Sequence, residues 1–206
     1  GTSIGRPYTS GTFSLSGNHT VVATVGSDKN PADLVLVQPN QPPLNLTDLN
    51  MDVLGHKVLA SAQRVIWPSS YDGKLIEGWI MKPPHFDPAG KYPMILEIHG
   101  GPHTAYGPNF STEAQLYAAA GYVVLYANPR GSTSYGEDFA NSIDLAYPGY
   151  DYDDLMTGVD ALLEQGYVDP KQLFVTGGSG GGVLTAWIVG KTDRFKAAAV
   201  AKPVIN

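Results

Sequence analysis

Ser179 lies at the centre of the glycine-rich stretch GGSGG (177–181), which satisfies the pattern G-x-S-x-G. The apolar residues FVT precede the stretch and VLTAWIV follow it, which predicts a buried strand, a sharp turn and then a helix. Glycines beside the serine leave room for a strained turn that presents the hydroxyl above the end of the strand. The pattern is therefore typical of a serine nucleophile, with the amide N–H of Gly180 as one donor to a developing oxyanion.

A linker or a phosphate-binding loop would also be rich in glycine. A flexible glycine-serine linker is disfavoured because both flanks of the stretch are apolar. A P-loop needs a lysine directly after its last glycine, and the next lysine is Lys191. The pattern G-x-G-x-x-G fails because Val183 and Thr185 stand where its last glycine would fall. A non-catalytic relic of the same turn stays open as an alternative, since function depends on a complete site.

A second segment, MILEIHGGPH (94–103), has the features of an oxyanion loop. Its apolar part predicts a buried strand, and HGGP follows at the strand end. In folds that present a serine on such a strand-to-helix turn, a loop at this place supplies the second backbone N–H to the oxyanion. We expect Gly101 to be that donor, with Gly100 as the alternative. His99 suggests a catalytic base, but its place at the strand end favours a structural role in hydrogen-bonding the loop.

Composition restricts the class of protein. The chain has 206 residues, of which 43% are hydrophobic and 16% charged, so it is globular and large enough for one core plus a small appendage. A net charge of -6, with 13 basic residues that do not cluster, argues against nucleic acid or an anionic membrane as a partner. There is no cysteine, and the histidines lack the spacing of metal ligands, so we expect neither metal nor cofactor.

The order of the predicted elements indicates an α/β fold. Short alternating apolar runs within residues 12–37 predict a small antiparallel meander, and residues 38–57 read as a Pro- and Asn-rich connector. Strands are predicted at 62–66, 75–81, 94–98, 122–127, 173–176 and 197–201, and helices at 112–120, 151–166 and 179–190. The last four strands are unbroken apolar runs. They favour a doubly wound, mostly parallel sheet that is covered on both faces.

Several motifs in the same order resemble the prolyl oligopeptidase family of serine peptidases. They are HGGPH, ANPRGSTSYGEDF, DYDDLMTGVDALLEQGYVDP and GGSGGG. The resemblance extends from about Arg64 to Asn206, and it is nearer to the acylaminoacyl-peptidase branch than to the dipeptidyl peptidases. One departure is Gly180, which stands where that branch often has His or another side chain.

The resemblance implies an α/β-hydrolase whose Ser179 attacks a peptide carbonyl and forms an acyl-enzyme. Residues 1–57 would be the end of a β-propeller and a connector, and residues 58–206 the N-terminal part of the catalytic domain. Arg130, Tyr106 and Tyr135 are candidate substrate-binding residues near the strand ends. For Arg130, an ion pair with Glu137 or Asp138 is the favoured alternative.

The chain does not contain a complete Ser-Asp-His triad in the usual order. All five histidines precede Ser179, and Asp193, the only acid after it, comes too soon to be the triad acid. We therefore expect an internal fragment of a longer peptidase, truncated after the strand at 197–201 and inactive alone. Its partners would be a peptide substrate and the remaining segments of the same peptidase, present in one chain or as a second chain.

Two other functions remain open at this point, a carboxylesterase and a non-enzymatic module that binds or dimerises through an open sheet edge. A homo-oligomer is accordingly one of the expected states. No apolar run is long enough to suggest a membrane span, so a soluble protein is expected, with a cytoplasmic location favoured and a periplasmic or secreted one left open.

Overall fold

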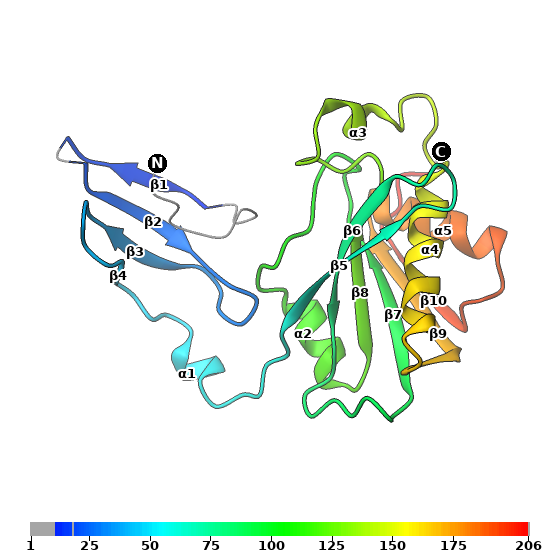
Figure 1. Cartoon of the computed structure of the whole chain (residues 1–206), viewed down its shortest axis with the longest axis horizontal. Helices are drawn as coiled ribbons and strands as arrows, with labels where there is room; N and C mark the ends of the chain where they lie inside the picture. Colours follow the sequence, from blue (N-terminus) through cyan, green and yellow to red (C-terminus); the bar gives the residue numbers. More distant parts are fainter. Residues whose placement is uncertain (1–10, 18, 206) are drawn as a thin grey trace.

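The computed structural model describes residues 11–17 and 19–205, and Figure 1 labels their helices and strands. Residues 1–10, 18 and 206 lie outside the described residues, so the predictions that include them are compared only in part. The chain forms two β-sheets, which we call the N-terminal sheet (β1–β4) and the central sheet (β5–β10). A connector with the short helix α1 (Met51–Leu54) joins them (Figure 1).

The N-terminal sheet is antiparallel, with its strands in the order β1-β2-β3-β4. The strands are Phe13–Leu15, Val21–Val25, Asp33–Val37 and Leu44–Asn45. The three alternating apolar runs form β1, β2 and β3, so the predicted meander is confirmed. The strand β4 and the helix α1 are additions, because both lie where the sequence analysis expects only a connector.

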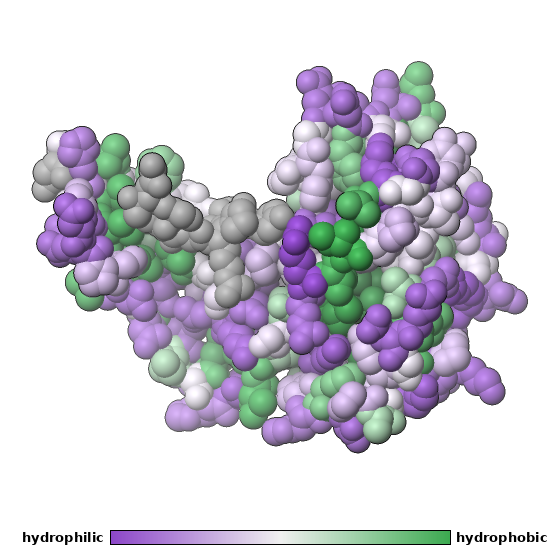
Figure 2. Space-filling view, viewed as in Figure 1, coloured by the Kyte–Doolittle hydropathy of each residue, from purple (hydrophilic) through white to green (hydrophobic). Residues whose placement is uncertain are grey.

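Much of the apolar surface of the N-terminal sheet remains exposed. Phe13 is 72% exposed, Leu15 60% and Leu44 58%, and apolar side chains are visible over this sheet in the space-filling view (Figure 2). Only a few of its apolar side chains, such as Val35 and Val37, are buried. The N-terminal sheet therefore contributes little to a core of its own.

The central sheet has six strands in the order β10-β9-β7-β8-β6-β5. The strands in chain order are Ala62–Pro68, Leu75–Met81, Tyr92–Ile98, Val123–Asn128, Val168–Gly178 and Ala197–Ala201. The strands β10, β9, β7 and β8 are parallel, whereas β6 pairs antiparallel with both β8 and β5. The unbroken apolar runs thus form the parallel strands, as predicted.

Four helices accompany the central sheet. They are α2 (Thr112–Ala119), α3 (Glu137–Asn141), α4 (Asp151–Glu164) and α5 (Gly180–Lys191). The three predicted helices are α2, α4 and α5, each within two residues of the expected bounds, and α3 was not predicted. The helices α4 and α5 pack on one face of the sheet, and α2 packs on the other.

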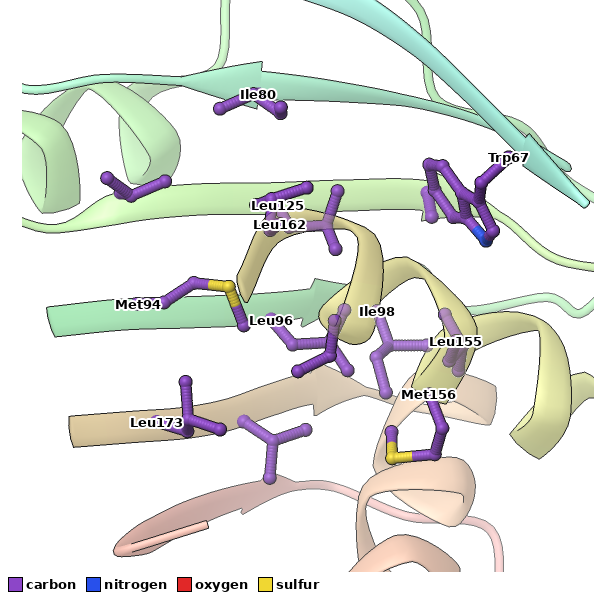
Figure 3. Packing of buried hydrophobic residues seen from close by; sticks show 14 of the residues in the cluster. Trp67, Ile80, Met94, Leu96, Ile98, Leu125, Leu155, Met156, Leu162 and Leu173 are labelled. Carbon is purple, nitrogen blue, oxygen red and sulfur yellow. The ribbon is translucent and has the colours of Figure 1, made fainter. Parts of the chain in front are cut away.

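The main core lies between the sheet and the helices α4 and α5 (Figure 3). Alternate residues of β7, Met94, Leu96 and Ile98, point into it and meet Leu155 and Leu162 of α4. All five side chains are at most 2% exposed, and burying a side chain of this size stabilises the fold by roughly 1.5–3 kcal/mol. This core fixes the strand ends from which the candidate site residues extend.

The strand order places two functionally informative loops together. The strand β7 lies between β8 and β9. The connection after β7 leads to the strand on one side of it, and the connection after β8 leads back to the strand on its other side. Ile98 at the end of β7 pairs with Gly177 near the end of β9. In open α/β sheets, ligands bind at the carboxyl ends of strands where the order reverses in this way. The segments that follow β7 and β9 therefore meet at the expected binding edge.

Candidate active site

Ser179 occupies a strained turn between β9 and α5. Its φ is 57° and its ψ is -116°, a conformation that costs a residue with a side chain about 1–3 kcal/mol. The amide N–H of Ser179 donates to the carbonyl oxygen of Ala201 in β10 at 3.1 Å. Ser179 is partly exposed. Its backbone forms the tight strand-to-helix turn that the sequence predicts.

Close backbone contacts require the glycines around Ser179. A Cβ built on Gly177 would lie 2.5 Å from the carbonyl oxygen of Gly181. One built on Gly181 would lie 2.1 Å from the carbonyl oxygen of Ile98, and one on Gly182 would lie 2.6 Å from that of Ala201. Real side chains do not approach backbone so closely. The glycines therefore allow helix α5 to start directly against β7 and β10.

The two predicted oxyanion-binding segments lie against each other at Ser179. A Cβ built on Gly100 would lie 3.3 Å from Cβ of Ser179 and 3.8 Å from the amide nitrogen of Gly180. A Cβ built on Gly180 would lie 3.3 Å from the amide nitrogen of Gly101. Gly180 is the first residue of α5, where N–H groups have no acceptor within the helix and the helix dipole favours negative charge. The structure thus brings Ser179, Gly180, Gly100 and Gly101 together.

His99 anchors the segment 99–103, which we call the HGGPH loop. Its Nδ1 donates to the carbonyl oxygen of Gly100 at 2.7 Å, and its Nε2 lies 2.9 Å from the hydroxyl of Ser132. Burial lowers the pKa of His99, which favours the neutral ring. These contacts agree with the structural role that the sequence favours for this histidine.

Asn128, at the end of β8, holds the chain just beyond the HGGPH loop. Its side-chain oxygen accepts from the amide N–H of Tyr106 at 2.7 Å, and its Nδ2 donates to the carbonyl oxygen of Tyr106 at 3.0 Å. Asn128 is fully buried and also donates to the hydroxyl of Tyr135 at 2.7 Å. Both candidate tyrosines therefore belong to one network around Asn128, a residue that the sequence analysis did not identify.

The two tyrosines differ in their relation to Ser179. Tyr106 lines a pocket of about 490 Å³ that also contains Ser179, and its hydroxyl donates to Glu97 at 3.3 Å. The hydroxyl of Tyr135 instead donates to Glu77, and Tyr135 is outside the described lining of that pocket. The geometry therefore brings Tyr106, but not Tyr135, to the candidate site.

Two carboxylates give the Ser179 pocket an acidic wall. Glu97 extends from β7 and Glu113 from the first turn of α2, and both line the pocket. Burial, followed by the nearby charge of Glu113, raises the pKa of Glu97 to about 7. Neither residue was among the sequence candidates, because an isolated glutamate, in an apolar strand or in the first turn of a helix, gives no local pattern.

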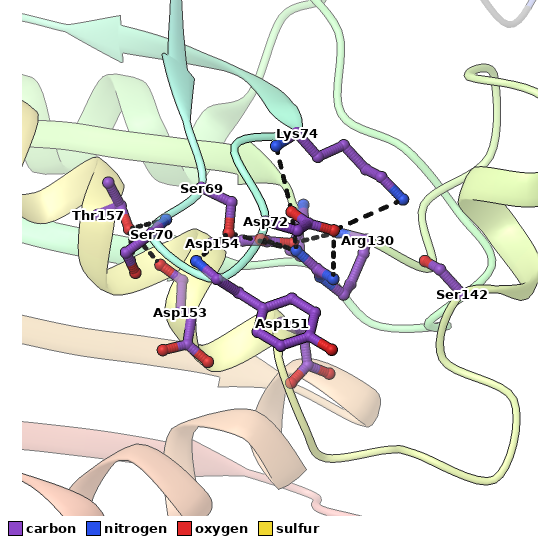
Figure 4. A network of polar contacts seen from close by, with 12 residues as sticks. Ser69, Ser70, Asp72, Lys74, Arg130, Ser142, Asp151, Asp153, Asp154 and Thr157 are labelled. Atoms are coloured by element: carbon purple, nitrogen blue, oxygen red, sulfur yellow. Dashed lines mark hydrogen bonds and ion pairs between the residues drawn. The ribbon is translucent and has the colours of Figure 1, made fainter.

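The expected ion pair between Arg130 and Glu137 or Asp138 is wrong. Arg130 instead donates to Asp154 of α4 and to Asp72 in the β5–β6 turn, as Figure 4 shows. The physical reason is burial, since the Arg130 side chain is only 3% exposed and Asp154 is fully buried, whereas Glu137 and Asp138 are exposed on α3.

The guanidinium of Arg130 has further partners that leave it little freedom. Nη2 donates to the hydroxyl of Ser69 at 3.2 Å, and the ring of Tyr71 lies against it with 4.9 Å between Cζ and the ring centroid. Its bonds with Asp154 tie the loop after β8 to the start of α4. These contacts make Arg130 a structural residue that holds the loop next to the candidate site.

The described histidines do not supply a base to Ser179. The ring nitrogens of His99 bind Gly100 and Ser132, and Nδ1 of His103 binds the carbonyl oxygen of Gly131 at 3.1 Å. Over residues 11–17 and 19–205, no histidine makes a hydrogen bond with the Ser179 hydroxyl. Within the described residues, the candidate nucleophile Ser179 and the candidate oxyanion donors therefore lie together without a histidine base.

One further contact at the turn was not predicted. The hydroxyl of Tyr147, in the segment between α3 and α4, donates to the carbonyl oxygen of Gly180 at 2.6 Å. The sequence around it, AYPGYDYDD, contains several similar tyrosines and no periodic pattern that distinguishes this one. Only the tertiary structure identifies Tyr147 as a neighbour of Ser179.

Other parts of the structure have no evident link to this chemistry. A pocket of about 540 Å³ lies between the N-terminal sheet and α1, and its described lining includes none of the candidate residues. Among the described residues, no three His, Asp or Glu side chains are grouped closely enough to hold a metal ion. No helix in the described ranges is long and apolar enough to cross a membrane.

Comparison with known proteins points to one family. The model of the prolyl oligopeptidase family matches residues 108–206. The uncharacterized peptidase YuxL of Bacillus subtilis is 41% identical over 196 residues, which are 94% of this chain and 30% of that protein. Dipeptidyl-peptidase 5 of Schizosaccharomyces pombe is 35% identical over 153 residues, 69% of this chain and 22% of that protein.

Solved structures agree with these relatives. The acylaminoacyl peptidase of Pyrococcus horikoshii superposes with a TM-score of 0.83 and 30% sequence identity, covering 91% of this chain and 30% of that one. This chain spans less than a third of the length of each of these three proteins. The likeness extends over both sheets, because it covers nearly the whole of this chain.

Proposed function

This chain belongs to the prolyl oligopeptidase family, and from that premise we propose that it carries the nucleophile of a serine peptidase that hydrolyses short peptides. The observation that carries the proposal is the strained conformation of Ser179, whose φ is 57°, beside the backbone of Gly101 and Gly180. A serine held at a strand end next to backbone amide groups is the arrangement that acyl transfer requires.

In the proposed reaction, the hydroxyl oxygen of Ser179 attacks the peptide carbonyl carbon and forms a tetrahedral intermediate. The amide N–H groups of Gly180 and Gly101 would stabilise the oxyanion, with Gly100 as the alternative donor in the HGGPH loop. The C–N bond then breaks, the serine proton passes through a base to the leaving amine, and water hydrolyses the acyl-enzyme.

The base and its orienting acid would come from residues outside this sequence. Serine is a weak nucleophile without a base, and no histidine follows Ser179 here. Related proteins are more than three times as long, which leaves room for both residues. We therefore expect the 206 residues alone to be inactive.

The proposed architecture follows the same relatives. Residues 58–206 would be the N-terminal part of an α/β-hydrolase catalytic domain, and residues 1–57 the end of a β-propeller and its connector. The parallel strands with Ser179 between β9 and α5 support the first assignment, and the antiparallel four-stranded sheet supports the second.

Further segments of the same peptidase are the proposed partners of the exposed sheet edge. The strand β10 (Ala197–Ala201) forms this edge, and every residue in it is exposed although all are apolar. An unpaired apolar edge is a site for adding another strand. Those segments, in one chain or as a second chain, would cover the edge and bring the base to Ser179.

The test compares three proteins for release of a chromogenic amine from an acyl-amino-acid substrate. They are the longer protein that contains this sequence, the same protein with Ser179→Ala, and the isolated 206-residue chain. We expect turnover only in the first, and labelling by a fluorophosphonate that Ser179→Ala abolishes. Equal turnover after Ser179→Ala would disprove the proposal, and turnover by the isolated chain would disprove the need for an external base.

The same experiment addresses the alternatives. A matched pair of ester and amide substrates separates a peptidase from a carboxylesterase, because only the peptidase cleaves the amide efficiently. Stable self-association of the longer protein without any Ser179-dependent hydrolysis would instead support a binding or dimerising module. Peptide hydrolysis remains favoured because the relatives with named activities are peptidases.

A further inference from the structure

Tyr147 reaches the first turn of helix α5 from a distant part of the chain. It lies between α3 and α4, 33 residues before Gly180, and its hydroxyl donates to the Gly180 carbonyl oxygen at 2.6 Å. Burial raises the pKa of Tyr147 to about 12, so the hydroxyl keeps its proton near neutral pH. Tyr147 is thus a permanent donor to the residue directly after Ser179.

The first turn of α5 needs support from outside the helix. It consists of Gly180, Gly181 and Gly182, and each glycine in a helix costs roughly 1 kcal/mol relative to alanine. Two side-chain hydroxyls bind this turn, that of Tyr147 at Gly180 and that of Thr185, which donates to the carbonyl oxygen of Gly181 at 2.8 Å. Thr185 belongs to the helix itself, whereas Tyr147 links the turn to another part of the fold.

The hydroxyl of Tyr147 also lies next to the proposed oxyanion donors. A Cβ built on Gly180 would lie 3.1 Å from this hydroxyl and 3.3 Å from the amide nitrogen of Gly101. The Tyr147 hydroxyl and the Gly101 backbone therefore both lie close to Gly180, so close that a methyl group there would fit only if its neighbours shifted by a few tenths of an ångström. A movement of Gly180 would change its distance from Gly101 and so the geometry of the donor pair.

Hydrogen bonds to Asp151 hold the turn that follows Tyr147. The Oδ1 atom of Asp151 accepts from the amide N–H groups of Gly149 and Tyr152, at 2.8 and 2.9 Å. Asp151 is fully buried at the start of α4. Two hydrogen bonds to a buried carboxylate therefore hold the turn after Tyr147 at the start of a packed helix, and such support favours a precise donor geometry.

We propose that Tyr147 is a positioning residue that holds Gly180 in place for oxyanion binding. This inference rests on the proposed peptidase function, since it assigns to Tyr147 the task of fixing one of its two backbone donors. Without the hydroxyl, the glycine turn gains freedom, and the donors no longer keep the spacing that the tetrahedral intermediate requires.

The test is Tyr147→Phe in the longer protein, which removes only the hydroxyl. We expect kcat to fall about tenfold with little change in KM, an effect of the size of one lost hydrogen bond expressed in the transition state. Tyr122→Phe is the matched control with unchanged kcat, because Tyr122 directly precedes β8 at the opposite end of the sheet. Thermal unfolding of both variants monitors the fold.

A peptide boronic acid distinguishes positioning from a general structural role. It forms a tetrahedral adduct with the serine and places an oxygen in the oxyanion site, so its Ki should rise in Tyr147→Phe by the same factor as kcat falls. The Ki of a non-covalent product peptide should not change. Unchanged kcat, or equal weakening of both inhibitors, would overturn the inference.

The outcome also separates this inference from the proposed function. If the wild-type protein shows no turnover that depends on Ser179, the proposed peptidase function itself is wrong. If that turnover exists and Tyr147→Phe retains all of it, only the role of Tyr147 is wrong.

Discussion

Arg130 donates from Nε and Nη2 to the two carboxylate oxygens of Asp154, at 3.0 and 2.8 Å, and both side chains are buried. The amide N–H of Arg130 also donates to Asp154, at 2.8 Å. Asp72 binds the other side of the guanidinium (Figure 4). This pair joins the loop after β8 to helix α4. The loop after β8 in turn supports the HGGPH loop, because its Ser132 contacts His99.

Arg130→Met should lower the free energy of unfolding by about 3–5 kcal/mol, because it leaves the buried Asp154 carboxylate without its cation. Urea unfolding measures the change. The control is Arg194→Met, which breaks a more exposed pair with Asp160 and should cost less than about 1 kcal/mol. A stable Arg130→Met variant with a raised KM would instead restore the substrate-binding role that the sequence suggested.

The sequence predicts the central sheet and the tight turn at Ser179 well because the signals for them are local. Unbroken apolar runs identify the buried parallel strands, and the stretch GGSGG identifies a tight turn wherever a strand precedes and a helix follows it. The contacts of Gly177 and Gly181 explain why glycine is needed in this stretch, since close backbone packing excludes any side chain at both positions. Such features need no knowledge of distant residues.

The partners of Arg130 were not predictable because they depend on tertiary distance. Asp154 and Asp72 are 24 and 58 residues away, whereas Glu137 and Asp138 are near in sequence but exposed. The residues next to Arg130 in the sequence do not indicate whether its partner is a near or a distant carboxylate. Tyr147 was missed for a similar reason, since only the packing of its segment against α5 brings its hydroxyl to the turn.

Gly181→Ala should prevent the native packing of α5, because the new Cβ would lie 2.1 Å from the carbonyl oxygen of Ile98. We expect a loss of at least about 3 kcal/mol of unfolding free energy, the upper range for overpacking. Gly190→Ala is the matched control in the same helix. It has no neighbour within 4 Å of its Cβ and should stabilise by about 0.5–1 kcal/mol. Similar stability of both variants would contradict the packing argument.

Asn128→Ala should release the chain beyond the HGGPH loop, because the amide N–H and the carbonyl oxygen of Tyr106 both lose their partner. We expect a loss of about 2–3 kcal/mol of stability, since buried polar groups are left without partners. Hydrogen exchange at the Tyr106 amide should become faster. Asn141→Ala, at the exposed end of α3, is the control. Unchanged exchange at Tyr106 would show that the loop is held by other contacts.

Glu97→Gln should flatten the dependence of stability on pH between about 4.5 and 7. Burial raises the pKa of Glu97 in the folded protein to about 7, above the ordinary 4.5, so the folded state favours the protonated carboxyl. The contribution of Glu97 to the free energy of unfolding is fully present below pH 4.5. It is lost as pH rises to about 7, because Glu97 releases its proton at lower pH in the unfolded chain than in the folded protein. Glutamine has no such proton and removes this decline.

Urea unfolding at a series of pH values measures the difference between Glu97→Gln and wild type. The difference is needed because Asp151, whose pKa burial raises to about 6, contributes a decline of the same sign in both proteins. Glu113→Gln tests the second cause. It removes the neighbouring charge that raises the pKa of Glu97, so the decline should still begin near pH 4.5 but end at a lower pH, and it should be smaller rather than absent. Parallel curves for Glu97→Gln and wild type would show that Glu97 has the same pKa in the folded and the unfolded protein, and that the acidic wall beside Ser179 is solvated.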